Sequence, residues 1–114
     1  MQDAVNLPER HPNRSFPTAG IASVYLRQQR YAEAEPIYRD MIEIRREAFG
    51  EDHLLVTELK SDLGAVLTGL GELDEAESVL TEVYKKFLEQ RGSDDPRAIL
   101  AAKRLEDIED LRKR

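Results

Sequence analysis

The sequence contains no cysteine and only two histidines among its 114 residues. Without cysteine the chain has no disulfide framework, no thiolate zinc site and no cysteine nucleophile. No apolar run approaches the roughly 18 residues of a membrane-spanning helix. The first residues also lack the basic-then-apolar order of a signal peptide. We therefore expect a protein of a reducing compartment, the cytoplasm, with no membrane partner.

Basic residues are outnumbered by acidic ones, 17 to 23, which gives a formal net charge of −6. We therefore expect no nucleic-acid partner, because nucleic-acid binding needs a basic face. Glycine and proline are spread thinly, so no linker or low-complexity segment divides the chain. The length corresponds to one domain, near the size at which burial of apolar surface only just offsets chain entropy.

Apolar residues recur every three or four positions in two long stretches, and β-branched runs with a period of two are missing. This spacing is typical of amphipathic helices. One face of the first stretch carries Ala34, Ile37, Tyr38, Met41 and Ile44, and one face of the second carries Ala76, Val79, Leu80, Val83 and Phe87.

The chain resembles itself when it is shifted by 42 residues. Residues 31–35 (YAEAE) then fall on residues 73–77 (LDEAE), and the turn that begins at Gly50 falls on the turn that begins at Gly92. Size and polarity agree over nearly the whole period. We therefore predict two helical hairpins followed by a single helix, and a stub at 1–14 that looks like the end of a preceding helix.

Capping residues place the ends of the five expected helices. We expect Ser15 and Asp52 to cap two helix starts, Asp94 or Asp95 to cap the last one, and Pro36 to bend the second helix slightly. Glycines end the other helices. The expected helices span about 16–29, 31–48, 53–69, 73–90 and 95–112, with Gly50, Gly71 and Gly92 just after the second, third and fourth.

The spacing of small residues inside each hairpin resembles the tetratricopeptide repeat. In that family small residues allow the two helices to cross closely, and here the pairs are Ala22 with Ala34 and Gly64 with Ala76. The period of 42 exceeds the usual 34 and, with the segments YAEAEPIY and FGEDH, resembles the kinesin-light-chain type. The expected divisions are a stub (1–14), two repeats (15–56 and 57–94) and a capping helix (95–114).

The resemblance implies an all-α fold, a right-handed solenoid of stacked hairpins with a concave groove lined mainly by first helices. Carried over position by position, it nominates groove residues from the first, third and fifth helices. They are Phe16, Ala19, Ser23, Leu26, Arg27, Glu58, Ser61, Asp62, Ala65, Thr68, Lys103 and Asp107, with Gly20, Gly69, Asp110 and Leu111 as further members.

Two binding chemistries known in the family are not matched. Repeats that hold the carboxylate of chaperone tails place lysines and asparagines where this chain has Ala19, Ser23 and Asp62. The paired asparagines frequent in kinesin light chains are missing as well. The expected groove is instead lined by small residues, acidic in its middle and with some basic residues at its end, which suits an extended or helical segment with basic and apolar side chains.

No catalytic or metal-binding arrangement emerges from the remaining polar residues. His53 is tempting, but it lies in a turn and has no second histidine nearby in sequence. The carboxylates around Glu35 and Glu43 alternate with arginines, as on a solvated helix face. No glycine-rich phosphate loop or nucleophile elbow occurs. We therefore expect no enzyme, no metal and no cofactor.

The leading interpretation is a non-enzymatic scaffold that binds a protein or peptide segment in the groove. Two alternatives stay open. In the first, the chain is an architectural segment that self-associates as a homodimer through an exposed surface of the first hairpin. In the second, it is a regulatory domain of a larger signalling protein. Two and a half repeats are few for a solenoid, in which stability comes from neighbouring repeats.

Overall fold

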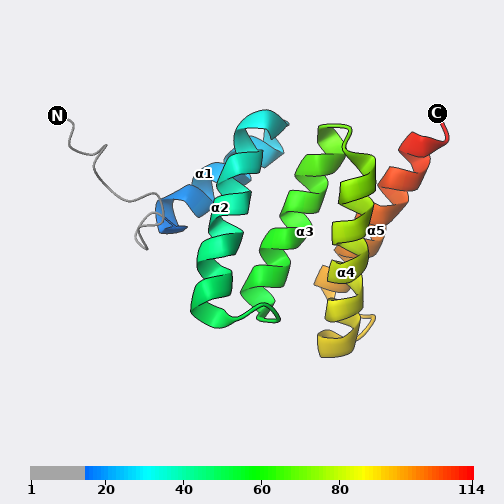
Figure 1. Cartoon of the computed structure of the whole chain (residues 1–114). Coiled ribbons are helices and arrows are strands. Elements are labelled where there is room, and N and C mark those ends of the chain that lie inside the picture. Colours follow the sequence, from blue (N-terminus) through cyan, green and yellow to red (C-terminus); the bar gives the residue numbers. More distant parts are fainter. Residues whose placement is uncertain (1–14) are drawn as a thin grey trace.

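The computed structural model describes residues 15–114, with side chains from Gly20 onward. It contains five helices: α1 (Ser15–Arg27), α2 (Tyr31–Phe49), α3 (Leu54–Gly69), α4 (Leu73–Arg91) and α5 (Pro96–Arg112) (Figure 1). Within these residues there is no strand, and the predicted all-α class is confirmed. The expected stub and the side chains of Ser15, Phe16 and Ala19 lie outside the described residues.

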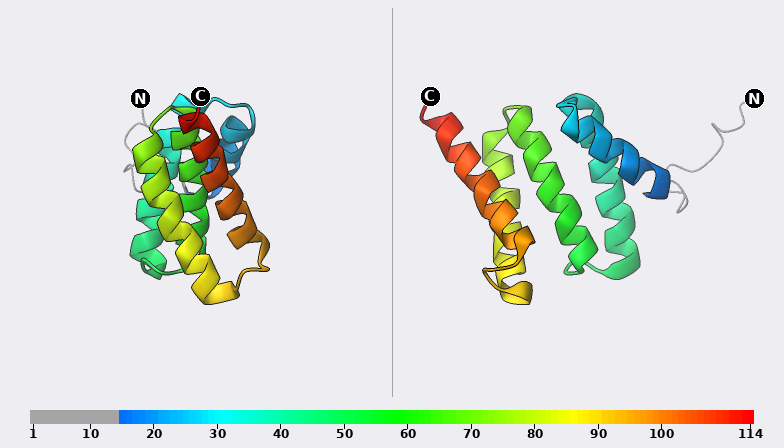
Figure 2. Two further views of the ribbon diagram at one scale, coloured as in Figure 1. Left: turned by 90° about the vertical axis from the view of Figure 1, so that its right-hand side faces the viewer. Right: turned by 180° about the vertical axis from the view of Figure 1, so that it is seen from behind.

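The helices form two layers, with α1, α3 and α5 on one side and α2 and α4 on the other (Figure 2). Each helix packs against the next one in the chain, and α3 also contacts α1 and α5. Short turns make consecutive helices antiparallel, so the chain builds a helical-repeat solenoid. The expected division between residues 56 and 57 falls inside the first turn of α3, because that helix already begins at Leu54.

Equivalent residues of the two long turns cap the helices that follow them. The Nδ1 atom of His53 accepts a hydrogen bond from the backbone N–H of Leu55 (3.1 Å), and Asp95 Oδ1 accepts one from the N–H of Arg97 (2.8 Å). The expected cap at Asp52 is therefore wrong, and of the two candidates at the last helix Asp95 is the cap. His53 has the role of a turn residue.

The turns inside the hairpins differ in one residue. Gly71, between α3 and α4, has a φ of 83°, in the left-handed region that glycine enters without steric cost. The equivalent residue between α1 and α2 is Gln29, which takes a φ of 62°. A residue with a Cβ atom is strained there, so the first hairpin carries a backbone cost that the second avoids.

Small residues permit the close helix crossings that the sequence predicts. Ala34 and Ala76 are completely buried, and a Cβ atom added to Gly64 would lie 2.5 Å from Leu80 Cγ. The apolar core is a continuous strip between the two layers, since one cluster joins α1 to α4 and includes Ile108 of α5. A second cluster joins α4 to α5 through Val83, Phe87, Ala98 and Ala101. The core therefore extends along the stack.

Candidate functional site: two hollows on one face of the stack

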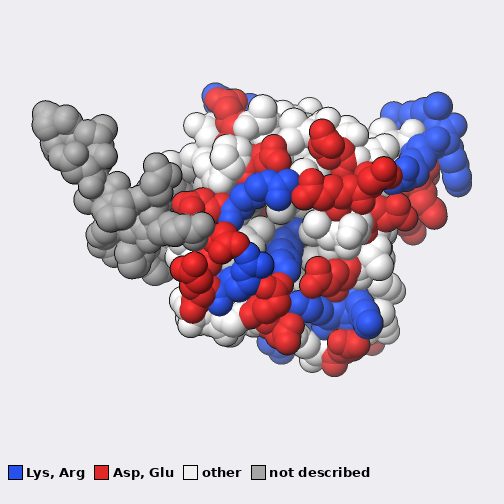
Figure 3. All heavy atoms as spheres, in the orientation of Figure 1, with Lys and Arg blue, Asp and Glu red and all other residues white. Residues whose placement is uncertain are grey.

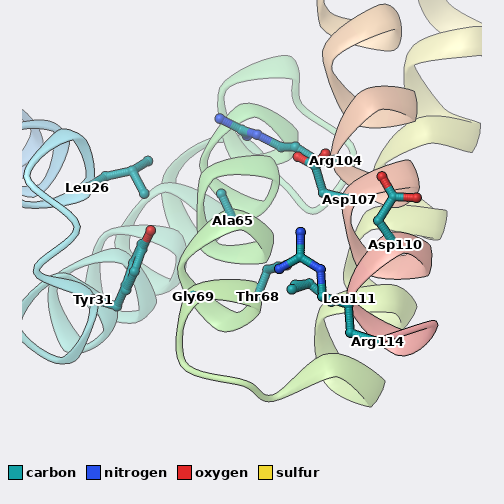
Figure 4. A pocket seen from close by; sticks show the side chains of 10 residues that line it. All are labelled: Leu26, Tyr31, Ala65, Thr68, Gly69, Arg104, Asp107, Asp110, Leu111 and Arg114. Atoms are coloured by element: carbon teal, nitrogen blue, oxygen red, sulfur yellow. The ribbon is translucent and has the colours of Figure 1, made fainter.

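The face formed by α1, α3 and α5 carries a wide hollow of about 530 Å³ near the carboxyl ends of these helices. Leu26 and Tyr31 form one wall and Leu111 the opposite wall, with Ala65 and Thr68 between them (Figure 4). The remaining lining residues are Gly69, Arg104, Asp107, Asp110 and Arg114. The ring of Tyr31 lies where a side chain at Gly69 would be, because an added Cβ atom would approach it to 2.3 Å.

A narrower hollow of about 210 Å³ lies between the amino-terminal halves of α3 and α5. Its apolar lining is Leu100 of α5, which is 44% exposed, and the buried Phe87 of α4. The polar lining consists of Glu58, Ser61, Asp62 and Arg97. Both hollows thus have an apolar part and a charged rim, as ligand-binding concavities usually do.

Arg104 separates the two hollows. From α5 its side chain reaches toward α3, and its Nη1 atom donates to Ser61 Oγ (2.8 Å) and to Asp62 Oδ1 (3.2 Å) (Figure 4). The hydroxyl of Tyr38, on α2, also interacts with the Asp62 carboxylate. A polar bridge therefore joins three helices across the middle of the face.

The bridge is partly shielded from water, since the Arg104 side chain is 17% exposed and the Asp62 side chain 36% exposed. Burial raises the pKa of the Asp62 carboxyl above the usual aspartate range, and the hydrogen bonds and charge of Arg104 only partly oppose this effect. Burial, with the negative charge of Asp62, also raises the pKa of Tyr38. Tyr38 is therefore a neutral donor at physiological pH, and Asp62 depends on Arg104 as its counter-charge.

The middle of the face is not acidic, contrary to the expectation from α3 alone. Asp62 is paired with Arg104, and Glu58 forms an ion pair with Arg97. Both arginines come from α5, and their reach into the middle of the groove was not predicted. In the wide hollow, Asp107 is paired with Lys103 at 3.0 Å. Three of the four carboxylates that line the two hollows therefore already have a cation.

The residues nominated from sequence fall into four groups. Leu26, Ala65, Thr68 and Asp107 line the wide hollow, as do the further members Gly69, Asp110 and Leu111, whereas Glu58, Ser61 and Asp62 line the narrow hollow. Gly20, Ser23, Arg27 and Lys103 line neither hollow. Phe16 and Ala19 lie among the undescribed side chains. The part these residues play in binding stays a prediction.

Six lining residues were missed. The 42-residue shift places Arg104 on Asp62 and Leu100 on Glu58, so the repeat itself contained the signal for these two. Tyr31 and Phe87 come from second helices, which the family resemblance did not nominate for the groove. The other two, Arg97 and Arg114, lie near the ends of α5.

The opposite face, formed by α2 and α4, is covered by interleaved acidic and basic side chains (Figure 3). Arg39 pairs with Glu35 and with Glu75 across the two helices, both at 3.0 Å. Glu51 pairs with Lys60 and Arg46, and these hydrogen bonds lower the pKa of the Glu51 carboxyl. This face therefore resembles the solvated, charge-paired surface that the sequence predicts.

Among the described residues no three histidine or carboxylate side chains are grouped so that they would hold a metal ion. None of the five helices in this part of the chain is long and apolar enough to span a membrane.

Comparison with known proteins identifies one family. The model of the family described as "Tetratricopeptide repeat" matches residues 15–89, which cover both hairpins. A search of curated proteins finds no match.

Proposed function

Because the chain belongs to the tetratricopeptide-repeat family, we propose that it is a non-enzymatic scaffold that binds a peptide or protein segment across the two hollows. Repeats of this family generally mediate protein–protein interaction. The observation that supports the site is the pairing of exposed apolar walls with a polar bridge on one face. The opposite face also has a hollow, of about 410 Å³, but charged side chains surround its apolar floor, among them Arg39 paired with Glu75.

A point substitution in the wide hollow tests this proposal. Ala65→Arg places a long charged side chain on the floor of the hollow, whereas Ser78→Arg adds the same charge at an exposed position of α4 that lines neither hollow. Partners are captured from native lysate with each full-length variant and identified by mass spectrometry. We expect Ala65→Arg to lose a partner that Ser78→Arg retains. Equal capture by both variants would contradict binding in the groove.

One observation favours self-association as a second function. Ile21 and Val24 of α1 are 46% and 36% exposed, whereas their repeat equivalents in α3, Leu63 and Val66, are 4% and 0% exposed. In α3 this face packs against α2, and among the described residues α1 has no such preceding helix. Multi-angle light scattering over a concentration series tests for a dimer, and Ile21→Ser with Val24→Ser is expected to abolish it. A monomer at every concentration removes this alternative.

We also assign the protein to the cytoplasm, which the absence of cysteine supports. The kinesin-light-chain type of repeat is likewise a proposal, carried by the period of 42 residues.

The division into two repeats and a capping helix is supported by the residue at one position of α5. Glu106 of α5 occupies the place of Ala22 and Gly64, so a further helix that crosses α5 as α4 crosses α3 meets a bulky charged side chain.

A further inference from the structure

We infer that the two hollows select an extended, uncharged segment with an aliphatic anchor in the narrow hollow and an aromatic anchor in the wide one, four to six residues apart. This inference rests on the proposed function and specifies the chemistry of the partner. Its three elements are the spacing of the hollows, the hydrogen-bonding capacity of Arg104 and the balance of charge.

The spacing comes from one stripe of α5. Leu100, Arg104, Asp107 and Leu111 follow one another at intervals of four, three and four residues, so they share a helix face. Leu100 lines the narrow hollow and Leu111, 37% exposed, the wide one. Eleven helical residues at about 1.5 Å each put these side chains about 16 Å apart. An extended segment covers that distance in about five residues, at roughly 3.3 Å each.

The bridge between the hollows can donate hydrogen bonds to a bound segment whose main-chain carbonyls have no partners of their own. Arg104 uses Nη1 for both of its bonds to α3, and its Nε and Nη2 donors have no acceptor among the described residues. The main chain of an extended segment has free carbonyls that accept such bonds, whereas a helix has already paired its own. The bridge therefore favours an extended segment over a helical one.

The charges favour an uncharged segment. Three of the four carboxylates in the two hollows are paired with Arg97, Lys103 and Arg104. A basic side chain gains little from these three unless it breaks an existing pair. The fourth carboxylate, Asp110, forms no ion pair among the described residues, but the charge of Lys103 already acts on it. An acidic side chain is opposed by the carboxylates already present. This replaces the basic partner that the sequence of α3 suggested.

The residues that line each hollow indicate which type of side chain it accepts. The wide hollow presents the half-buried ring of Tyr31 with Leu26 and Leu111, and an aromatic side chain packs well against such a ring. The narrow hollow is smaller and lined by Leu100 over Phe87, which suits a leucine or isoleucine side chain.

A panel of synthetic fluorescein-labelled peptides tests the inference with the full chain, by fluorescence polarisation. Each peptide carries one leucine and one phenylalanine in a serine, threonine and glutamine background, at spacings of two, four, five, six or eight residues. Matched peptides carry one lysine or one glutamate between the two anchors. A central proline in half of the panel prevents helix formation. We expect the tightest binding at four to six residues, with or without proline, and about tenfold weaker binding at two and eight, equivalent to about 1.4 kcal/mol.

Two neighbouring residues of α5 provide a matched pair of variants. Leu100→Ser is expected to weaken the best peptide about tenfold, because the aliphatic anchor loses its wall. Ile99→Ser changes a neighbouring apolar residue that is even more exposed (57%) and lines neither hollow, and is expected to leave the affinity unchanged. Arg104→Lys keeps the positive charge beside Asp62 but removes the planar fork, and is expected to weaken binding about three- to tenfold.

Four results would overturn the inference: no binding by any neutral peptide, affinity independent of spacing, binding lost with proline, or tighter binding by peptides with lysine or glutamate between the anchors. The capture experiment with Ala65→Arg separates such a failure from failure of the proposed function. If Ala65→Arg loses its native partner while the panel does not bind, the groove is used by a segment of different chemistry. If capture does not depend on Ala65, the proposed function itself is wrong.

Discussion

Arg104 donates a hydrogen bond to Asp62 over 3.2 Å, and the two residues occupy equivalent positions of adjacent repeats, 42 residues apart. In the first repeat the same position is Gly20, where an added Cβ atom would meet nothing within 4 Å. One repeat position is thus occupied by glycine, aspartate and arginine in turn. The acidic and the basic member form the bridge between the two hollows.

Removal of Arg104 should leave Asp62 without its counter-charge. We expect Arg104→Met to lower the free energy of unfolding by about 1–3 kcal/mol at pH 7, because a partly buried carboxylate loses a charged hydrogen-bond partner. The folded-state pKa of Asp62 is already raised, so Asp62 binds protons more readily folded than unfolded. Its unfavourable contribution therefore appears as pH rises above about 4. The loss should be larger at pH 7 than at pH 4, by urea denaturation.

The double variant Asp62→Asn with Arg104→Met is the control. Without a carboxylate at position 62 the loss of Arg104 should cost less, and its pH dependence should disappear. Additive effects of the two substitutions would mean that the pair does not interact in solution.

A glycine in the turn of the first hairpin should raise the stability of the protein. Gln29 has a φ of 62°, and its repeat equivalent Gly71 has a φ of 83°. Gln29→Gly relieves backbone strain of about 1–2 kcal/mol but increases the entropy of the unfolded chain, so we expect a net gain of about 0.5–1 kcal/mol. The reciprocal substitution Gly71→Gln should destabilise the protein by a similar or larger amount. Both are measured as shifts in Tm, and a loss of stability with Gln29→Gly would contradict the strain.

The close crossing of α3 and α4 should not accept a larger residue. A Cβ atom at Gly64 would lie 2.5 Å from Leu80 Cγ, and Leu80 is completely buried, so the leucine has little room to move. We expect Gly64→Val to destabilise the fold by about 2 kcal/mol through overpacking. The same substitution at Gly20 should change stability by less than about 0.5 kcal/mol, because its surroundings are open. Equal effects at the two glycines would refute the packing argument.

The number and extent of the helices were predictable because apolar spacing and the 42-residue repeat act over many residues at once. The start of α3 was harder to predict. Asp52 is a common capping residue type, whereas histidine is not, and the choice between Asp52 and His53 depends on backbone geometry in a four-residue turn. Comparison with the second turn contained the answer, since His53 falls on Asp95.

Repeat positions predicted several residues that line the hollows, but not the ion pairs that these residues form. Leu26, Ala65 and Asp107 line the wide hollow because the repeat geometry fixes which face of each first helix points inward. The net charge in the middle of the groove could not be predicted from the sequence of α3 alone. It depends on arginine side chains of α5, which lie about 40 residues further along the chain. Arg97 and Arg104 have long side chains, and only the packing of α5 against α4 decides that they reach Glu58 and Asp62.

The ion pairs that Glu51 forms with Lys60 and Arg46 predict an acid-dependent loss of stability. Hydrogen bonds from Lys60, and from Arg46, lower the folded-state pKa of Glu51. A lowered pKa contributes stability above the ordinary glutamate value of about 4.3, and this contribution is lost as pH falls through the folded-state pKa. Since Glu51 is 41% exposed, solvent screening limits the effect of Glu51→Gln to about 0.5–1 kcal/mol at pH 7, shrinking toward zero in acid. Glu109→Gln, at an exposed position of α5, serves as the control and should leave the acid limb of the urea-unfolding profile unchanged. A Glu51→Gln profile parallel to the wild-type one down to pH 3 would show that these ion pairs do not persist in solution.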